Sequence, residues 1–276
     1  MKKLKKLTHL FIFVFLTVLT QVGGIIYIVS FLSHSFIEKR VTTRIYQRVL
    51  KCITFIILYL TVSFLLIPIL AKPFGRVPLP LTKTNHLRPL TFLTCLLNRH
   101  YVRPELKEAS MNVANEMHAT FPTTVINYLD ANFPFINNFP LFPHLSHNDG
   151  KKLDLAFCYK ESSSDKATND CPSAIGYGIC EEPLPNETNT AAFCAEKGYW
   201  NYSLLTYIIP QGNKKSFKLD HQRTKKLVNL LTDEKSIGKL FIEPHLVRRL
   251  NLHSEKIRFH GCQAVRHDDH IHIQLK

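Results

Sequence analysis

The sequence predicts an α+β protein in which a central antiparallel sheet with flanking helices is preceded by two transmembrane helices. Two long uncharged apolar runs lie before residue 72, and short strand-like stretches are mixed with amphipathic stretches beyond residue 90. Such a mixture is typical of an antiparallel sheet that carries helices. The 276 residues are 45% hydrophobic, which excludes a wholly disordered chain.

Residues 1–72 are predicted to form a membrane anchor. Residues 10–32 form a run of 23 residues without a charge, and residues 52–71 form a second run of 20. Each run reaches the roughly 20 residues that a helix needs to cross a bilayer. The alternatives are two buried core helices, or a cleaved signal peptide followed by one span. The first run is longer than a typical signal-peptide core of about 7–15 residues.

The basic excess of the chain is concentrated in this anchor. Residues 1–72 hold 10 Lys or Arg and one acid, so most of the net charge of +14 lies there and predicts no nucleic-acid partner. The N-terminal tail and the loop at 33–51 carry nearly equal numbers of basic residues. The positive-inside rule alone therefore leaves the orientation open.

Six of the seven cysteines lie beyond the second apolar run. They permit three disulfides, whose pairing cannot be read from the sequence, and disulfides need an oxidising compartment. Reduced buried thiols are the alternative, and a zinc ribbon is less favoured because no C-x-x-C pair occurs. We expect the C-terminal domain to face outward and the basic loop to lie in the cytoplasm.

Residues 73–90 contain four prolines and predict a linker or extended stalk. A folded domain is expected over residues 91–276. Its expected elements, in chain order, are a helix at 105–120, a strand-like stretch at 123–135, a strand at 153–159, a polar insertion with cysteines at about 160–200, an extended or helical segment at 201–210, an amphipathic helix at 221–234, a strand at 239–243, a short helix at 245–252 and two strands around a turn at 256–275.

Two histidine motifs carry the candidate chemistry. His270 and His272 are separated by one residue, so on a strand their imidazoles share one face. Upstream, His147 and Asp154 flank a turn that contains Gly150, which lets the histidine fold back towards the strand that bears the aspartate. Two imidazoles and one carboxylate suit Zn²⁺ with a fourth position left for water. Alone, an H-x-H motif is more often a polar strand face, but the combination is more specific.

In order along the chain, Ser-His-x-x-Gly-x-x-x-Asp at 146–154 is followed by His-Asp-Asp-His-x-His at 267–272. This pattern resembles the penicillin-insensitive murein endopeptidases, which belong to the wider group of zinc peptidases with the lysostaphin-type and D-Ala-D-Ala peptidase fold. The resemblance covers roughly residues 120–276. The two apolar runs and the insertion with cysteines lie outside the pattern.

The resemblance implies roles for particular side chains. It implies that His147, Asp154 and His272 bind zinc, and that His270 and His267 line the active site. It also implies a substrate, the peptide cross-links or stems of bacterial peptidoglycan.

The residues just before the last histidine leave the general base open. In the related D-Ala-D-Ala carboxypeptidases a Glu three residues before the last zinc histidine takes this role, and Asp269 occupies that position here. Asp268 and Asp269 are alternatively groups that fix the tautomer of a ligand histidine, or solvated turn residues. Ile271 stands where the family usually has an aromatic residue, which bears on substrate preference.

These observations predict a multi-pass zinc metallopeptidase of the inner (cytoplasmic) membrane whose catalytic domain faces the periplasm or cell wall. Zinc-activated water would attack the peptide bond. His270 would accept the proton or stabilise the oxyanion, and His267 would donate to the leaving amine. The alternatives are an inactive domain that binds wall peptide, another zinc hydrolase on the same scaffold and a non-enzymatic membrane protein. No oligomeric state follows from the sequence.

Overall fold

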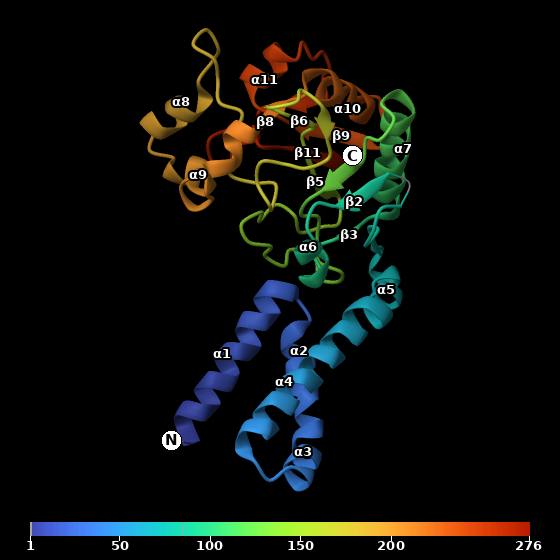
Figure 1. Ribbon diagram of the computed structural model, residues 1–276, viewed down its shortest axis with the longest axis vertical. Helices are drawn as coiled ribbons and strands as arrows, with labels where there is room; N and C mark the ends of the chain where they lie inside the picture. Colours follow the sequence, from blue (N-terminus) through green and yellow to red (C-terminus); the bar gives the residue numbers. More distant parts are fainter. Residues whose placement is uncertain (1, 85) are drawn as a thin grey trace.

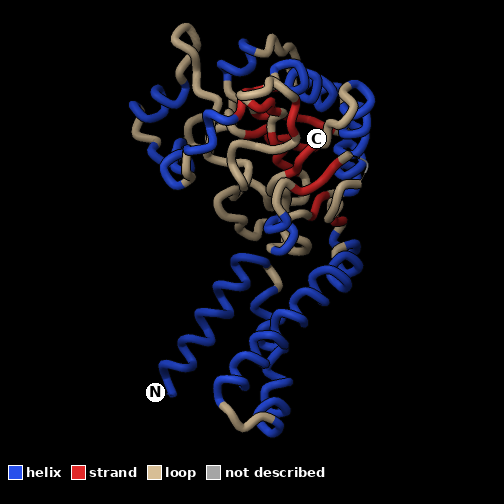
Figure 2. The backbone as a smooth tube through the Cα atoms, in the orientation of Figure 1, coloured by secondary structure: helices blue, strands red, loops and turns tan. Residues whose placement is uncertain are grey.

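The computed structural model describes residues 2–84 and 86–276. Figure 1 shows two parts along the longest axis: helices that begin at the N-terminus, and a globular domain that contains the C-terminus. Figure 2 shows that the strands gather inside the domain, with helices and long loops around them. The protein is therefore a mixed α/β protein with a helical N-terminal part.

Three helical segments run along one another in the N-terminal part (Figure 1). Helix α1 (Lys2–Thr20) runs towards the domain, α2 (Gly23–Ser30) turns back and packs on α1, and the segment that begins with α4 (Arg44–Thr61) returns to the domain. The connecting and following elements are η1 (Phe31–Ser33), α3 (His34–Arg40), the π-helical η2 (Val62–Leu66), α5 (Ile67–Leu70) and η3 (Lys72–Phe74).

The prediction of two membrane-spanning helices is only partly confirmed. Among the described residues, one helix, the 27-residue segment Arg44–Leu70, is long and apolar enough to cross a membrane. The first apolar run is interrupted because Gln21 adopts a left-handed conformation with φ 66° and the chain reverses there. Gly24 permits the close return, since a Cβ at this position would collide with Thr17 Oγ1 and the Phe13 carbonyl oxygen of α1.

The strands of the domain are β1 (Val77–Pro78), β2 (Leu87–Pro89), β3 (Tyr101–Val102), β4 (Ile126–Tyr128), β5 (Lys152–Ala156), β6 (Tyr159–Glu161), β7 (Ala167–Thr168), β8 (Phe217–Leu219), β9 (Ile237–Phe241), β10 (Ile257–Arg258) and β11 (His270–Leu275). Six of them form the main sheet in the order β10-β9-β11-β5-β4-β2. Smaller sheets are formed by β1-β3 and β7-β6-β8.

The expectation of a single central antiparallel sheet is wrong. The pairs β9-β11, β11-β5 and β5-β4 are antiparallel, but β10 pairs with β9 and β2 pairs with β4 in parallel. Parallel neighbours need a crossover connection instead of a tight hairpin. The chain supplies one at each edge, since α7 (Pro104–Thr120) lies between β2 and β4, and α11 (Pro244–Arg249) lies between β9 and β10.

Helices α7 and α10 (His221–Asp233) pack together in the main apolar core. The carboxylate of Asp220 caps α10 by accepting a hydrogen bond from a backbone N–H of its first turn. Ile271 and Ile273 of β11 belong to the same core, so one face of this strand is apolar. The helices predicted at 105–120 and 221–234 are confirmed. The other helical elements are α6 (Phe92–Leu96), α8 (Thr190–Glu196), η4 (Trp200–Ser203), α9 (Leu204–Ile208) and η5 (Gly212–Ser216).

Residues 73–90, expected to form a linker or stalk, are partly paired with the domain. β1 pairs with β3, and β2 forms an edge of the main sheet. The Gln21 side chain accepts a 2.8 Å hydrogen bond from the backbone N–H of Phe135, which ties the helical reversal to a domain loop. An apolar cluster also joins the two parts and contains Val22, Ile26, Ile67, Ala71 and Tyr101. The helical part and the domain therefore pack against each other.

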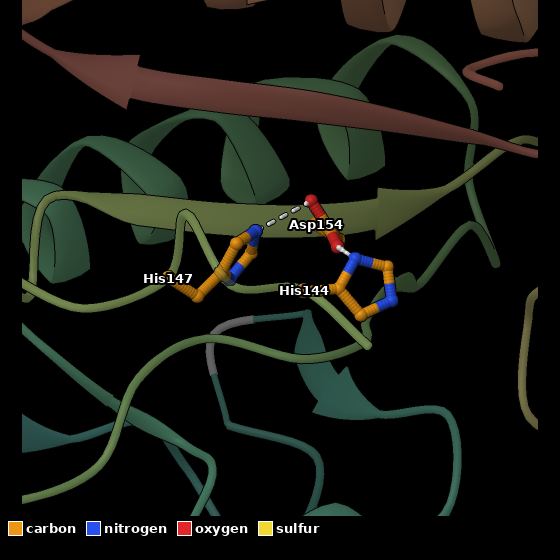
Figure 3. A group of neighbouring side chains, drawn as sticks. All are labelled: His144, His147 and Asp154. Atoms are coloured by element: carbon orange, nitrogen blue, oxygen red, sulfur yellow. Dashed lines mark ion pairs between the residues drawn. The ribbon is translucent and has the colours of Figure 1, made fainter. Parts of the chain in front are cut away.

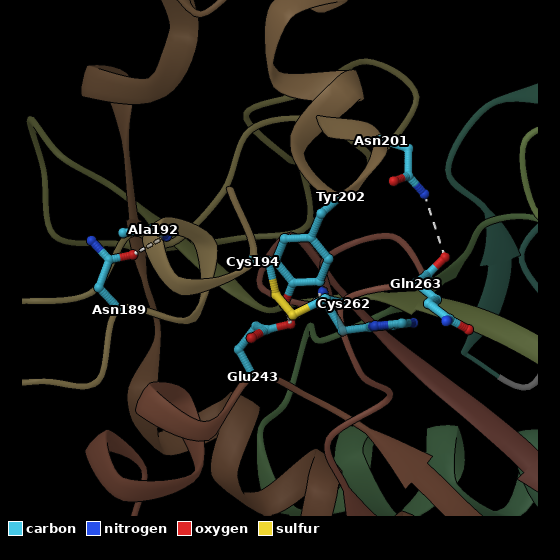
Figure 4. The surroundings of a disulfide bond; sticks show 9 residues. Asn189, Ala192, Cys194, Asn201, Tyr202, Glu243, Cys262 and Gln263 are labelled. Atoms are coloured by element: carbon cyan, nitrogen blue, oxygen red, sulfur yellow. Dashed lines mark hydrogen bonds between the residues drawn. A yellow bond between two sulfur atoms is a disulfide. The ribbon is translucent and has the colours of Figure 1, made fainter. Parts of the chain in front are cut away.

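Within residues 2–84 and 86–276 one disulfide forms, where the sequence permits three. Cys194 of α8 bonds to Cys262, on the segment that leads to β11, across a sequence separation of 68 (Figure 4). Cys95, Cys158 and Cys180 are buried free thiols, as the alternative interpretation expected, and Cys171 is a half-buried one. The disulfide therefore connects the predicted insertion to the C-terminal histidine motif.

Candidate metal centre

The pairing of β5 with β11 brings Asp154 and His272 together. In this antiparallel pair His272 lies directly opposite Asp154, and opposed residues project from the same face of a sheet. His272 Nδ1 lies 2.8 Å from Asp154 Oδ1. Because the neighbouring Ile271 and Ile273 point into the core, the strand alternation predicted for the H-x-H motif is confirmed.

His147 joins this pair from a long loop. Its Nε2 lies 3.3 Å from Asp154 Oδ1 and 3.1 Å from His272 Nδ1. Its Nδ1 lies 2.7 Å from the carbonyl oxygen of Ala131, so Nδ1–H donates there and the Nε2 lone pair faces the carboxylate. A backbone acceptor of this kind fixes the tautomer of a metal-binding histidine.

The loop geometry places a further histidine at the same carboxylate. Gly150 closes the loop with φ 81°, and its N–H donates a 3.0 Å hydrogen bond to Asn132 Oδ1. His144 precedes His147 by one turn, and its carbonyl accepts the His147 N–H at 2.9 Å. The His144 Nδ1 atom lies 3.4 Å from Asp154 Oδ2, on the other oxygen of the carboxylate.

His144, His147 and Asp154 form a buried group that could hold a metal ion (Figure 3). One ligand atom from each lies within 4.8 Å of the others. His144 was missing from the predicted ligands. The sequence feature that could have indicated it is its position three residues before His147, in the same proline-containing loop.

His270 and Asp269 lie beside this group. Nδ1 of His270 hydrogen-bonds to Oδ1 of Asp269, and Oδ2 of Asp269 accepts a 2.5 Å hydrogen bond from the Gly178 N–H. The buried His270 Nε2 has no hydrogen-bond partner within the described part of the chain and lies 3.7 Å from Asp154 Oδ2. Asp269, which was expected among the catalytic groups, thus has one oxygen engaged by the His270 ring and the other by a backbone N–H.

His267 lies near the two histidines of the H-x-H motif. Its ring centroid is 4.9 Å from that of His270 and 5.6 Å from that of His272. The His267 backbone N–H donates a 3.2 Å hydrogen bond to Glu243 Oε1, which also accepts from the Tyr202 hydroxyl at 2.5 Å. Glu243 therefore holds the segment that carries His267.

Tyr177, from the predicted insertion, completes the surroundings of Asp154. Its hydroxyl donates to Asp154 Oδ2 at 2.8 Å and accepts from the Asp130 backbone N–H at 3.0 Å. Sequence reasoning missed this residue because no motif spacing connects it to the aspartate. The flanking Gly176 and Gly178, both with positive φ, are the only local signal of the turn that aims the ring.

Burial and mutual contacts set the protonation of the group. Burial lowers the pKa of His272 to about 4 and holds the pKa of His144 well below its usual value. Burial alone would raise the pKa of Asp154, but interactions with His147 and His270 hold it well below its ordinary range. Neutral imidazoles and an ionised carboxylate are the forms that bind metal ions.

A cleft with a volume of about 460 Å³ opens beside the group. Its walls come from the segments 142–146, 201–205 and 260–267. His144, His267 and His272 line it, so the cleft gives access to the ligand group.

Comparison of the chain with protein-family models found no match, and comparison with curated proteins found none. The functional proposal therefore depends on the residues of the site and on the motifs that carry them.

Proposed function

We propose that the chain is a membrane-anchored zinc-dependent hydrolase of peptide bonds. The observation that carries the proposal is a triangle of ligand atoms, with 3.3 Å between His147 Nε2 and Asp154 Oδ1, 2.8 Å between Asp154 Oδ1 and His272 Nδ1, and 3.1 Å between His272 Nδ1 and His147 Nε2. Tetrahedral zinc with bonds of about 2.0–2.2 Å holds its ligand atoms roughly 3.3 Å apart. The 3.3 Å and 3.1 Å sides lie close to this separation and the 2.8 Å side is shorter. Three protein ligands leave a fourth position for water, as in catalytic zinc sites.

His144 supports a second candidate function. It approaches Asp154 through Oδ2, whereas the triangle uses Oδ1. With His144 as a fourth ligand the site would be closed, and a closed site is the structural kind. The second candidate is therefore a non-catalytic zinc domain that binds peptide without cutting it.

The other histidines suit proton transfer. When bound, zinc would lower the pKa of its water to about 7 and polarise the scissile carbonyl. Asp269 fixes the ring of His270 through Nδ1. Burial lowers the pKa of His270, but the charges of Asp154 and Asp269 outweigh it and raise the pKa to about 9, so Nε2 carries a proton and can stabilise the oxyanion. His267 lines the cleft beside it. Burial and the neighbouring His270 and His272 hold the pKa of His267 well below its ordinary value, so its ring is neutral and suits accepting a proton from the attacking water.

The proposal includes an orientation in the membrane, with the domain outside the cytoplasm. The reversal at Gln21 places both basic segments at the end of the helical part that lies away from the domain (Figure 1). Cytoplasmic segments carry an excess of Lys and Arg. The Cys194–Cys262 disulfide supports the same orientation, since disulfides persist in oxidising compartments. The basic residues are Lys5 and Lys6 of α1, Lys39 and Arg40 of α3 and Arg44 of α4.

Peptidoglycan peptides are the proposed substrate class, because the motifs at 146–154 and 267–272 resemble those of murein endopeptidases. The test is incubation of the full-length protein with muropeptides, with and without a zinc chelator, followed by mass spectrometry. The full chain is needed because the helical part packs on the domain. Chelator-sensitive cleavage would support the proposal. Intact muropeptides in the presence of stoichiometric zinc would favour the non-catalytic domain.

A further inference from the structure

The cleft beside the candidate metal-binding group of His144, His147 and Asp154 has walls without a fixed charge. None of the described residues that line it is Lys, Arg, Asp or Glu. Two arginines approach its walls, but both are already paired. Arg99 lies 3.3 Å from Asp130 Oδ2 and donates to the Phe142 carbonyl at 3.0 Å, and Arg266 pairs with Asp268.

Apolar side chains dominate the rim of the cleft. Phe142, Leu145 and Leu204 line it and are 56%, 53% and 36% exposed. Leu205 and Val265 extend the same apolar lining. Such a concentration of exposed apolar surface at a concave site indicates that a ligand covers it.

The remaining polar groups of the lining are neutral and can pair with a peptide backbone. Ser146 offers a hydroxyl, and Asn201 and Gln263 offer side-chain amides. Asn201 Nδ2 donates a 3.4 Å hydrogen bond to the Gln263 backbone carbonyl, so the two walls meet there (Figure 4). The Gln263 amide and the Asn201 amide oxygen remain available for a ligand.

We propose that this cleft binds an uncharged, apolar stretch of the substrate peptide next to the bond that is cleaved. The proposal deepens and rests on the proposed peptidase function, because the cleft leads to the ligand group. Its volume of about 460 Å³ lies within the range of small-ligand sites, about 300–1,000 Å³. A carboxylate or ammonium group placed there would lose its hydration without gaining an oppositely charged Lys, Arg, Asp or Glu partner among the described residues of the lining.

The test uses alanine-based fluorogenic peptides in which one position is Leu, Asp or Lys. Separate sets of peptides place this position at each site on either side of the cleaved bond. The full-length zinc-loaded protein in detergent is expected to show kcat/KM at least about tenfold higher for Leu than for Asp or Lys at the positions that enter the cleft. Leu204→Lys should lower the rate for the Leu peptide and raise it for the Asp peptide. Phe193→Lys adds the same charge at an exposed position outside the lining and should leave the preference unchanged.

The outcomes separate this inference from the proposed function. Equal rates for Leu, Asp and Lys peptides would overturn the inference while leaving the hydrolase in place. If the zinc-loaded protein cleaves none of these peptides, the muropeptide assay decides the hydrolase proposal, and the binding of labelled peptides tests the cleft. Tighter binding of the Leu peptide, lost in Leu204→Lys but not in Phe193→Lys, would support the inference, and equal binding would overturn it.

Discussion

The hydroxyl of Tyr177 donates a 2.8 Å hydrogen bond to Oδ2 of Asp154. The tyrosine comes from the segment predicted to be a surface insertion, and the aspartate comes from the strand at the centre of the metal group. Oδ1 of the same carboxylate faces His147 and His272. The hydrogen bond therefore fixes which oxygen of Asp154 is free to bind a metal ion.

Tyr177→Phe should weaken zinc binding by about 10–100-fold, the usual cost of removing a hydrogen bond behind a metal ligand. Competition with a chromophoric chelator measures the affinity. Tyr207→Phe is the matched control, because Tyr207 is 82% exposed. An unchanged affinity in Tyr177→Phe would show that this contact does not hold the ligand.

Cys262→Ser should lower the free energy of unfolding by about 2–4 kcal/mol, because the disulfide closes a long loop in the unfolded chain. Asn201 and Leu204 of the cleft follow Cys194 closely, and Gln263 follows Cys262, so peptide binding should weaken as well. Denaturant unfolding and peptide titration measure the two effects. Cys52→Ser removes an exposed free thiol and should change neither the stability nor the peptide binding. An equal loss of stability in Cys262→Ser and Cys52→Ser would contradict the prediction.

Acid should destabilise the domain through His100. Burial, followed by the charge of Lys107, lowers the pKa of this histidine to about 3, whereas an unfolded histidine titrates near 6.5. Between these values the unfolded chain binds the proton and the folded chain does not, so stability is full above about pH 6.5 and falls as the pH drops towards 3. At pH 5 the loss from this group is about 2 kcal/mol.

Unfolding measured at pH 8 and pH 5 tests this. His100→Phe should show a smaller loss of stability between the two pH values than the wild-type protein, because other buried histidines still contribute. His253→Phe, at an exposed position, is the control. If His100→Phe lost as much stability between pH 8 and pH 5 as the wild-type protein, the assignment of acid sensitivity to His100 would be contradicted.

The proposed orientation predicts opposite labelling of the two ends of the structure. In a Cys52→Ser background, Lys166→Cys on the domain should react with a membrane-impermeant maleimide in intact spheroplasts. Lys5→Cys at the far end of α1 should react only after permeabilisation. Both positions are exposed, so accessibility depends on the side of the membrane. Labelling of Lys5→Cys in intact spheroplasts would contradict the orientation.

Local rules predicted the parts of the site that depend on strand alternation. His272 and Asp154 were both expected near the metal, because an H-x-H strand shows two imidazoles on one face and Gly150 allows the upstream loop to return. Asp268 was left between two interpretations, and it is buried in an ion pair with Arg266. Arg266 precedes Asp268 by only two residues, but the burial of Asp268 comes from the tertiary fold.

Long-range packing decided what the sequence did not predict. The left-handed Gln21 is stabilised by contact with Phe135, far along the chain, so no local pattern reveals that the first apolar run reverses. The parallel edge strands depend on where α7 and α11 pack. Tyr177 reaches Asp154 across 23 residues of sequence with no spacing rule to connect them.

The most direct test of the central claim compares zinc content and turnover in the full-length protein and two variants. Elemental analysis gives the zinc bound per chain, and mass spectrometry of muropeptides gives turnover. The wild-type protein should bind one zinc ion and cleave, His147→Ala should lose both properties, and His270→Ala should keep zinc and lose cleavage. Full activity in His270→Ala, or stoichiometric zinc with normal cleavage in His147→Ala, would contradict the account.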